Sequence, residues 1–100
     1  LDPFQGKFYA NYAASKALMG VGGIGPKGLS NTDPQLIQAE RMMIEHAGEV
    51  IILADSSKFD STGTLYLCGF DSISMIITDT GVTSEQRQMV EDHGVRLVTV

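Results

Sequence analysis

The sequence predicts an α/β fold in which a mostly parallel sheet carries helices on both faces. Short runs of β-branched residues, of which 49–54 is the clearest, are typical of strands buried in a parallel sheet. Segments with apolar residues at helical spacing alternate with these runs, and each begins at a residue that caps helices well. Alternation of this kind indicates right-handed crossovers and a Rossmann-like, three-layer domain.

One helix, one strand and a loop are expected in the first third of the chain. Asp2-Pro3 supplies a cap and a first-turn proline, and predicts a helix over residues 3–14. The apolar stripe of this helix has members four residues apart, namely Phe4, Phe8 and Tyr12. A short apolar strand follows over residues 16–20, and a glycine-rich loop is expected from Gly20 to Ser30.

A second helix is expected to begin at Asp33-Pro34, which again joins a cap to a first-turn proline. The spacing predicts a buried stripe made of Leu36, Ala39, Met43 and Ala47, flanked by Ile37 and Ile44. Gly48 is placed to end this helix in the left-handed conformation, directly before the strand 49–54.

Two more strands, one short strand or extended edge, and one helix are predicted in the second half of the chain. Residues 64–67 form the short strand or extended edge, and residues 74–78 form a clearer strand. The segment from Thr83 to Gln86 has the pattern of a capping box and starts a helix that extends to about His93. Gly94 ends that helix, and the last strand covers residues 95–100.

Composition limits the possible function classes. Of the 100 residues, 43% are hydrophobic and 19% charged, so the chain can form a core as one small domain or part of a larger one. A formal net charge of −5 argues against a basic patch for nucleic-acid phosphates. The single cysteine, Cys68, permits no internal disulfide and fits a cytoplasmic location. The sequence has no signal peptide and no apolar run of roughly 20 residues, so we expect no membrane partner.

Asp55-Ser56-Ser57-Lys58 is the most informative polar stretch. It lies at the carboxyl end of a predicted buried strand, where open α/β sheets bind ligands. One acid, two hydroxyls and one ammonium suit a small polyhydroxylated anion better than an apolar ligand. Lys58 can be a general acid, a Schiff-base lysine, an anion clamp or a solvated lysine, and its position favours the clamp. Asp55 either accepts from sugar hydroxyls or caps the turn made by the serines, and the pattern alone does not separate these roles.

The loop from Gly20 to Gly25 matches the G-x-G-x-x-G pattern of dinucleotide-binding turns and follows a predicted strand. In that motif the last glycine opens a helix that faces a pyrophosphate, whereas a turn beginning at Pro26 follows here. A flexible connection is therefore the main alternative. A third interpretation is a loop whose bare backbone at Gly22 and Gly23 approaches a sugar or a phosphate.

The remaining candidate groups are isolated in the sequence. Glu40 lies in the middle of a predicted helix, where a solvated position is the ordinary interpretation. His46 and His93 lie at helix ends, and neither has a second His or Cys at ligand spacing. We therefore predict no metal site and no cofactor.

Several segments together carry a resemblance to a known family. They are residues 16–24, Gly28-Leu29-Ser30, residues 40–44 with Ala47, residues 50–59 and Ile76-Ile77-Thr78-Asp79. Over about residues 15–100 the chain resembles the carboxyl-terminal effector domain of the DeoR family of bacterial transcriptional repressors. The most specific part is Ala54-Asp55-Ser56-Ser57-Lys58-Phe59. Ser15 departs from the family, which usually has Asp before the Lys-Ala strand.

The family domain in turn resembles sugar-phosphate isomerases such as ribose-5-phosphate isomerase A. That enzyme has a similar strand ending in Asp-x-Ser-Lys and a catalytic glutamate in the preceding helix, and Glu40 fits that spacing 15 residues before Asp55. The enzyme also needs two aspartates at positions that correspond to about Met19 and Gly22, and the loop 20–25 has no carboxylate. Proton transfer between neighbouring carbons takes a base and groups that stabilise an enediolate. We interpret the site as one that kept binding and lost catalysis, with Glu40 as a relic of the base.

The resemblance implies an effector-sensing domain of a repressor of carbohydrate metabolism, and not an enzyme. The effector is expected to be a phosphorylated sugar or sugar acid. The binding residues implied are Asp55, Ser56, Ser57, Lys58, Gly22, Gly23 and Glu40. A catalytically active sugar-phosphate isomerase and a dinucleotide-binding module are the alternatives.

The resemblance also implies an assembly. We expect self-association as a dimer or tetramer, and DNA contact only through a separate winged helix-turn-helix domain. The chain begins at Leu1 and not at a methionine, so we expect residues 1–100 to be the carboxyl-terminal part of an effector domain, without its first half.

Overall fold

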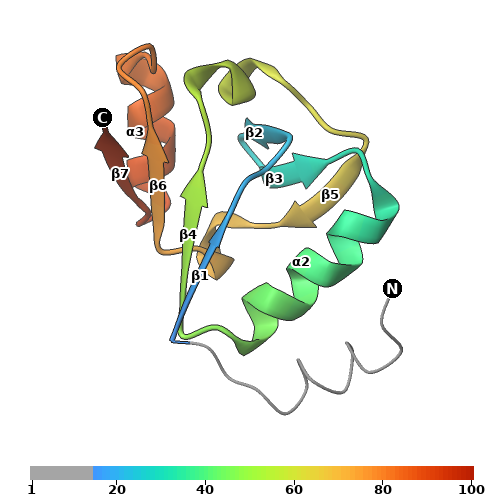
Figure 1. Cartoon of the computed structure of the whole chain (residues 1–100). Coiled ribbons are helices and arrows are strands. Elements are labelled where there is room, and N and C mark those ends of the chain that lie inside the picture. The colour runs from blue at the N-terminus through green and yellow to red at the C-terminus, as the bar shows by residue number, and fades with distance from the viewer. Residues whose placement is uncertain (1–14) are drawn as a thin grey trace.

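Four strands form a parallel sheet in the computed structural model, which describes residues 15–100. The sheet has the order β1-β4-β6-β7, made of β1 (Lys16–Met19), β4 (Glu49–Leu53), β6 (Met75–Thr78) and β7 (Arg96–Thr99). Because all neighbouring pairs are parallel, the carboxyl ends of the strands meet at one edge, which lies at the top of Figure 1. The predicted α/β class and parallel sheet are confirmed. The helix predicted over residues 3–14 lies outside the described residues.

A second sheet is antiparallel and has the order β2-β3-β5. Its strands are β2 (Gly23–Gly25), β3 (Gly28–Asn31) and β5 (Leu65–Cys68). The prediction of a loop from Gly20 to Ser30 is therefore wrong in part, because Ile24 and Leu29 are buried and draw the chain into a hairpin around a two-residue turn. Gly28 adopts φ +130°, and a Cβ there would lie 2.2 Å from Cys68 O, so this position requires glycine.

Both helices in the described part of the chain begin at their predicted caps. They are α2 (Pro34–His46) and α3 (Ser84–Asp92). Asp33 Oδ1 accepts from Gln35 N at 2.9 Å at the start of α2. The predicted capping box at the start of α3 is complete, with Thr83 N donating to Gln86 Oε1 at 2.9 Å and Gln86 N to Thr83 Oγ1 at 3.0 Å. Neither helix is long and apolar enough to cross a membrane.

Two details of α2 differ from the prediction. The fully buried residue is Ile37 at 4% exposure, whereas Leu36 of the predicted stripe is 49% exposed. Ile37 belongs to the core and Ile44, two turns further along α2, packs against it. The buried face of α2 is therefore rotated from the predicted stripe. The predicted left-handed stop at Gly48 is also wrong, because the helix ends in an extended Ala47 and leads directly into β4. Gly94, with φ +80°, does end α3 as predicted.

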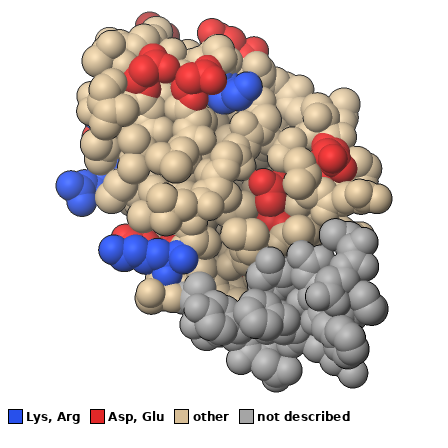
Figure 2. Space-filling model, viewed as in Figure 1, with Lys and Arg blue, Asp and Glu red and all other residues tan. Residues whose placement is uncertain are grey.

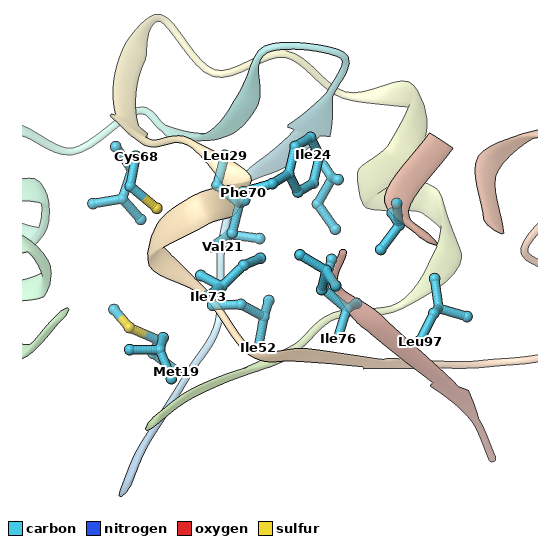
Figure 3. Close-up of a cluster of buried hydrophobic side chains, with 14 of the residues drawn as sticks. Met19, Val21, Ile24, Leu29, Ile52, Cys68, Phe70, Ile73, Ile76 and Leu97 are labelled. Carbon is cyan, nitrogen blue, oxygen red and sulfur yellow. The ribbon is translucent and has the colours of Figure 1, made fainter. Parts of the chain in front are cut away.

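The core lies on one face of the parallel sheet. Figure 3 shows Ile52, Ile76 and Leu97 pointing from that sheet toward the small sheet and the segment around Phe70. Val90 of α3 and Ile37 of α2 belong to the same cluster, so both helices pack on this face. The helix layer expected on the other face stays a prediction for a longer protein.

Candidate functional site

The loop after β4 contains a short 3-10 helix, η1 (Ser56–Asp60), with Asp55 as its cap. Asp55 Oδ1 accepts hydrogen bonds from Ser57 N at 2.9 Å and from Ser57 Oγ. Lys58 N donates to Asp55 O at 3.1 Å. Asp55 therefore caps the serine turn. Its other oxygen, Oδ2, accepts no hydrogen bond from the described residues, which leaves it available to a ligand hydroxyl.

Asp79, directly after β6, ties this loop to the neighbouring strand. Its Oδ2 accepts from Ser56 N at 2.9 Å, and its Oδ1 accepts from Gly81 N at 2.8 Å. Since β4 and β6 are paired, Asp55 and Asp79 lie at the same edge of the sheet. Figure 2 shows acidic side chains gathered along this upper edge, with basic atoms beside them. No role for Asp79 was predicted, although an acid directly after a buried strand is the same signal that identified Asp55.

Hydrogen bonds hold both carboxyls in their charged form. The pKa of Asp55 is lowered chiefly by the hydrogen bond from the Ser57 hydroxyl, and the pKa of Asp79 chiefly by the backbone N–H of Ser56. The nearby Lys58 ammonium also lowers the pKa of Asp55. The ion pairs within residues 15–100 are Lys16–Glu49 and Arg87–Glu91, and the Lys58 ammonium takes part in neither. It is therefore free to pair with an added anion.

Glu40 belongs to a separate cluster. Its Oε1 accepts a hydrogen bond from Asn31 Nδ2 at 3.1 Å, at the end of β3. Burial raises the pKa of Glu40 and outweighs the lowering effect of the Asn31 hydrogen bond. No hydrogen bond of the described residues joins Glu40 to the loop 55–58. The predicted site residues thus fall into two groups, and the structure does not bring Glu40 into direct contact with Lys58.

Gly22 and Gly23 are predicted to approach a ligand, but in the structure both lie close to other parts of the protein's own chain. Gly22 N donates to Ser30 O at 3.0 Å, and a Cβ on Gly22 would lie 3.2 Å from Asn31 Oδ1. A Cβ on Gly23 would lie 2.3 Å from Ser61 O. Close packing of the hairpin against the segment after η1 therefore explains the glycine at position 23. A ligand contact at either glycine stays a prediction.

A groove of about 360 Å³ opens beside the hairpin turn. It is lined by residues 25–30, residues 61–64 and Tyr66. None of the predicted effector-binding residues lines this groove. The groove and the polar loop 55–58 are therefore two separate candidate binding sites. Each has a lysine, which is Lys27 at the groove and Lys58 in the loop.

A polar loop at the carboxyl edge of a parallel sheet lies where proteins of the α/β class usually bind small molecules. The family described as DeoR C terminal sensor domain matches residues 1–80 of this chain. The HTH-type transcriptional regulator UlaR of Shigella dysenteriae serotype 1 (strain Sd197) is 30% identical over 96 residues, which are 96% of this chain and 38% of that protein. The HTH-type transcriptional repressor GlcR of Bacillus subtilis (strain 168) is 33% identical over 89 residues, 89% of this chain and 34% of that protein.

The chain belongs to the DeoR family and corresponds to its carboxyl-terminal sensor domain. It spans little more than a third of the length of these curated relatives. The matched family is described as a sensor domain, and the relatives that it resembles are named as transcriptional regulators.

Proposed function

We propose that this domain senses a phosphorylated sugar or sugar acid for a cytoplasmic repressor of carbohydrate metabolism. The family supports the sensing role, and the chemical class of the effector is the step that we add. The proposal makes this chain a binding module and not an isomerase. The chain is then the carboxyl-terminal part of a longer regulator.

The observation that carries the proposal is the combination of charges at the loop 55–58. The ammonium of Lys58, which forms no ion pair among residues 15–100, suits a phosphoryl or carboxylate oxygen. The carboxylates of Asp55 and Asp79 suit sugar hydroxyls, which donate hydrogen bonds to them. A ligand with several anionic groups would be repelled by these two carboxylates. A sugar with hydroxyls along its length and one anionic group at its end fits this edge best.

DNA binding is assigned to a part of the regulator outside this chain. The net charge of −5 makes the domain itself a poor partner for nucleic-acid phosphates. The effector changes operator affinity only if it binds one arrangement of the regulator more tightly than the other. Loop 55–58 can transmit such a preference, because Asp79 links it to the start of the segment that leads into α3.

Calorimetric titration of the full-length regulator with a panel of sugar phosphates tests the proposal. For the sugar phosphate of the panel that binds most tightly, the variant Lys58→Ala should raise the dissociation constant about tenfold or more, since it removes a charge-assisted hydrogen bond. Lys27→Ala is the matched control, because it removes the same charge from the hairpin turn and should leave the dissociation constant unchanged.

Two results would contradict this assignment. Weakened binding in Lys27→Ala with unchanged binding in Lys58→Ala would move the ligand to the groove beside the hairpin. Absence of binding for every sugar phosphate and sugar acid of the panel would reject the effector class itself.

A further inference from the structure

One buried hydroxyl at the carboxyl edge of the parallel sheet has no hydrogen-bonding partner among the described residues. It belongs to Thr78, the last residue of β6, whose side chain is 2% exposed. Thr78 Oγ1 is the one buried side-chain nitrogen or oxygen of residues 15–100 that makes no hydrogen bond to the protein. Nearly all buried polar groups in folded proteins have a partner, so this exception needs an explanation.

Packing does not explain the hydroxyl. The Thr78 side chain lies on the same face of the sheet as Ile76, because strand side chains alternate, and that face carries the core. Valine has the shape of threonine and favours strands as well, so it would fill the same space without an unpaired polar atom. The described residues already bury Thr78, so a further part of the protein on the other face of the sheet would not reach it. The carboxyl edge is the side from which a partner can come.

Strand register places this hydroxyl next to the loop 55–58. Leu53 of β4 pairs with Ile77 of β6, so the next residues, Ala54 and Thr78, are neighbours at the ends of the two strands. Ala54 N donates to Ile77 O at 3.1 Å, which keeps the strands together up to this point. The loop 55–58 begins at the residue after Ala54. The hydroxyl therefore lies one residue inside the sheet from the candidate effector site.

The path from that site to the hydroxyl is short. Ala54 is partly exposed and its side chain is a single methyl group, so little material separates Thr78 from the edge on the side of β4. Phe59 of η1 packs against the same core as Ala54. Because a 3-10 helix has poorer hydrogen-bond geometry than an α-helix, a small shift of η1 costs little. A molecule bound at the loop 55–58 can therefore reach Thr78.

The neighbouring charges decide which chemical group the hydroxyl can bind. Asp79 follows Thr78 directly, and the hydrogen bond from the backbone N–H of Ser56 lowers its pKa and keeps it charged. A carboxylate at this point repels a phosphoryl or carboxylate group but not a neutral hydroxyl. A sugar hydroxyl can both donate to Thr78 Oγ1 and accept from it. Lys58 remains the partner of the anionic group.

We propose that Thr78 Oγ1 binds one sugar hydroxyl of the effector and so discriminates between sugars. The inference rests on the proposed function and adds to it the residue that selects the sugar. A buried hydroxyl rejects an analogue that lacks the matching hydroxyl, because its own hydrogen bond then stays unmade. The exposed Asp55 discriminates less, since water replaces a missing partner there.

The experiment is a calorimetric titration of the full-length regulator with hexose and pentose monophosphates, followed by the monodeoxy analogues of the tightest one. Thr78→Val should raise the dissociation constant of the parent sugar phosphate about tenfold. One deoxy analogue, which lacks the matching hydroxyl, should bind Thr78→Val no more weakly than it binds the wild type. Thr78→Ser keeps the hydroxyl and should retain most of the affinity. Thr99→Val is the matched control, at the register partner on β7, and should leave the dissociation constant unchanged.

A second measurement needs no ligand. Thr78→Val replaces an unpaired buried hydroxyl by a methyl group of the same shape. The thermal unfolding midpoint of the ligand-free regulator should therefore rise by about 2 °C or more. A lower midpoint would show that the hydroxyl already has a partner in the folded protein, and would overturn the inference.

The affinity results separate this inference from the proposed function. An unchanged dissociation constant in Thr78→Val, with weakened binding in Lys58→Ala, overturns the inference and leaves the effector class intact. Equal losses in Thr78→Val for the parent and for every deoxy analogue also overturn it, because the substitution then acts through the shape of the site. Absence of binding for every sugar phosphate rejects the proposed function and the inference with it.

Discussion

The carboxylate of Asp79 accepts a hydrogen bond from Ser56 N at 2.9 Å and so joins the ends of two neighbouring strands, β4 and β6. The other oxygen of the same carboxylate holds Gly81 N at 2.8 Å. A Cβ on Gly81 would lie 2.6 Å from Ser56 Oγ, so the two loops are in close contact. One side chain therefore fixes the position of the loop 55–58 relative to the entry into α3.

Replacement of Asp79 should weaken effector binding although Lys58 itself is unchanged. Asp79→Ala removes both acceptors, so the backbone at Ser56 loses its fixed position, and we expect the effector dissociation constant to rise about tenfold. Asp79→Asn keeps one acceptor oxygen and should fall between Asp79→Ala and the wild type. Calorimetric titration of the regulator measures this series. Equal affinities for all three proteins would show that the loop needs no support from Asp79.

Acid should remove the contribution of these hydrogen bonds to stability. The pKa values of Asp55 and Asp79 are lowered in the folded protein from an ordinary value of 3.8. Groups with a lowered folded pKa stabilise the protein above their unfolded pKa, and the contribution is lost as pH falls through the folded pKa. We expect urea unfolding to separate wild type from Asp79→Asn at pH 7, and the gap to close below about pH 4. The gap should be small, because the groups are at the surface, and a gap that widens in acid would contradict this assignment.

The strand and helix pattern was predictable because it depends on local sequence. The caps at Asp33 and Thr83 and the stop at Gly94 are set by residues within one turn of the helix end, and they occur where predicted. The hairpin of β2 and β3 was missed because its strands are three and four residues long and rich in glycine. Burial of Ile24 and Leu29 against Phe70 and the parallel sheet creates it, and such long-range packing leaves little local signal.

Gly23 and Gly25, two residues apart in β2, should respond differently to the same substitution. Gly23→Ala places a Cβ 2.3 Å from Ser61 O and 2.7 Å from Ser30 Oγ, so the backbone must shift, and we expect a loss of about 2 kcal/mol in the free energy of unfolding. A Cβ on Gly25 meets nothing within 4 Å, so Gly25→Ala should lie within about 0.5 kcal/mol of the wild type. Urea denaturation measures both. Similar losses in the two variants would mean that strand propensity, and not contact with Ser61, sets the cost.

The polar loop was predictable for the same reason as the strand before it, since an acid and a lysine directly after a buried run lie at the ligand edge of the sheet. The relation of Glu40 to that loop was not predictable from their spacing. The separation of 15 residues between Glu40 and Asp55 places Glu40 in the helix before the strand. It does not determine the direction in which the Glu40 side chain points. In the folded chain the nearest hydrogen-bonding partner of Glu40 is Asn31, from a hairpin that the sequence did not reveal.

Glu40→Gln separates a structural role of Glu40 from a functional one. Burial raises the pKa of Glu40 above its ordinary value of 4.5, so its charge opposes folding at neutral pH, and the opposition disappears as pH falls through the folded pKa. A glutamine keeps an acceptor for Asn31 Nδ2 and removes the charge. We therefore expect Glu40→Gln to be as stable as the wild type or more stable at pH 7, and the difference to shrink near pH 4. Urea denaturation at the two pH values measures this.

The control for Glu40 lies on the same helix. Glu45 is exposed, so Glu45→Gln removes the same charge from α2 and should leave the free energy of unfolding at pH 7 within about 0.5 kcal/mol of the wild type. If Glu40 is only a partly buried carboxylate beside Asn31, Glu40→Gln should also leave effector affinity within a factor of about two of the wild type. Turnover of a sugar phosphate by the wild-type regulator that disappears in Glu40→Gln and persists in Glu45→Gln would instead make Glu40 a working base. That result would replace the sensor-only interpretation, because a relic of catalysis has no turnover to lose.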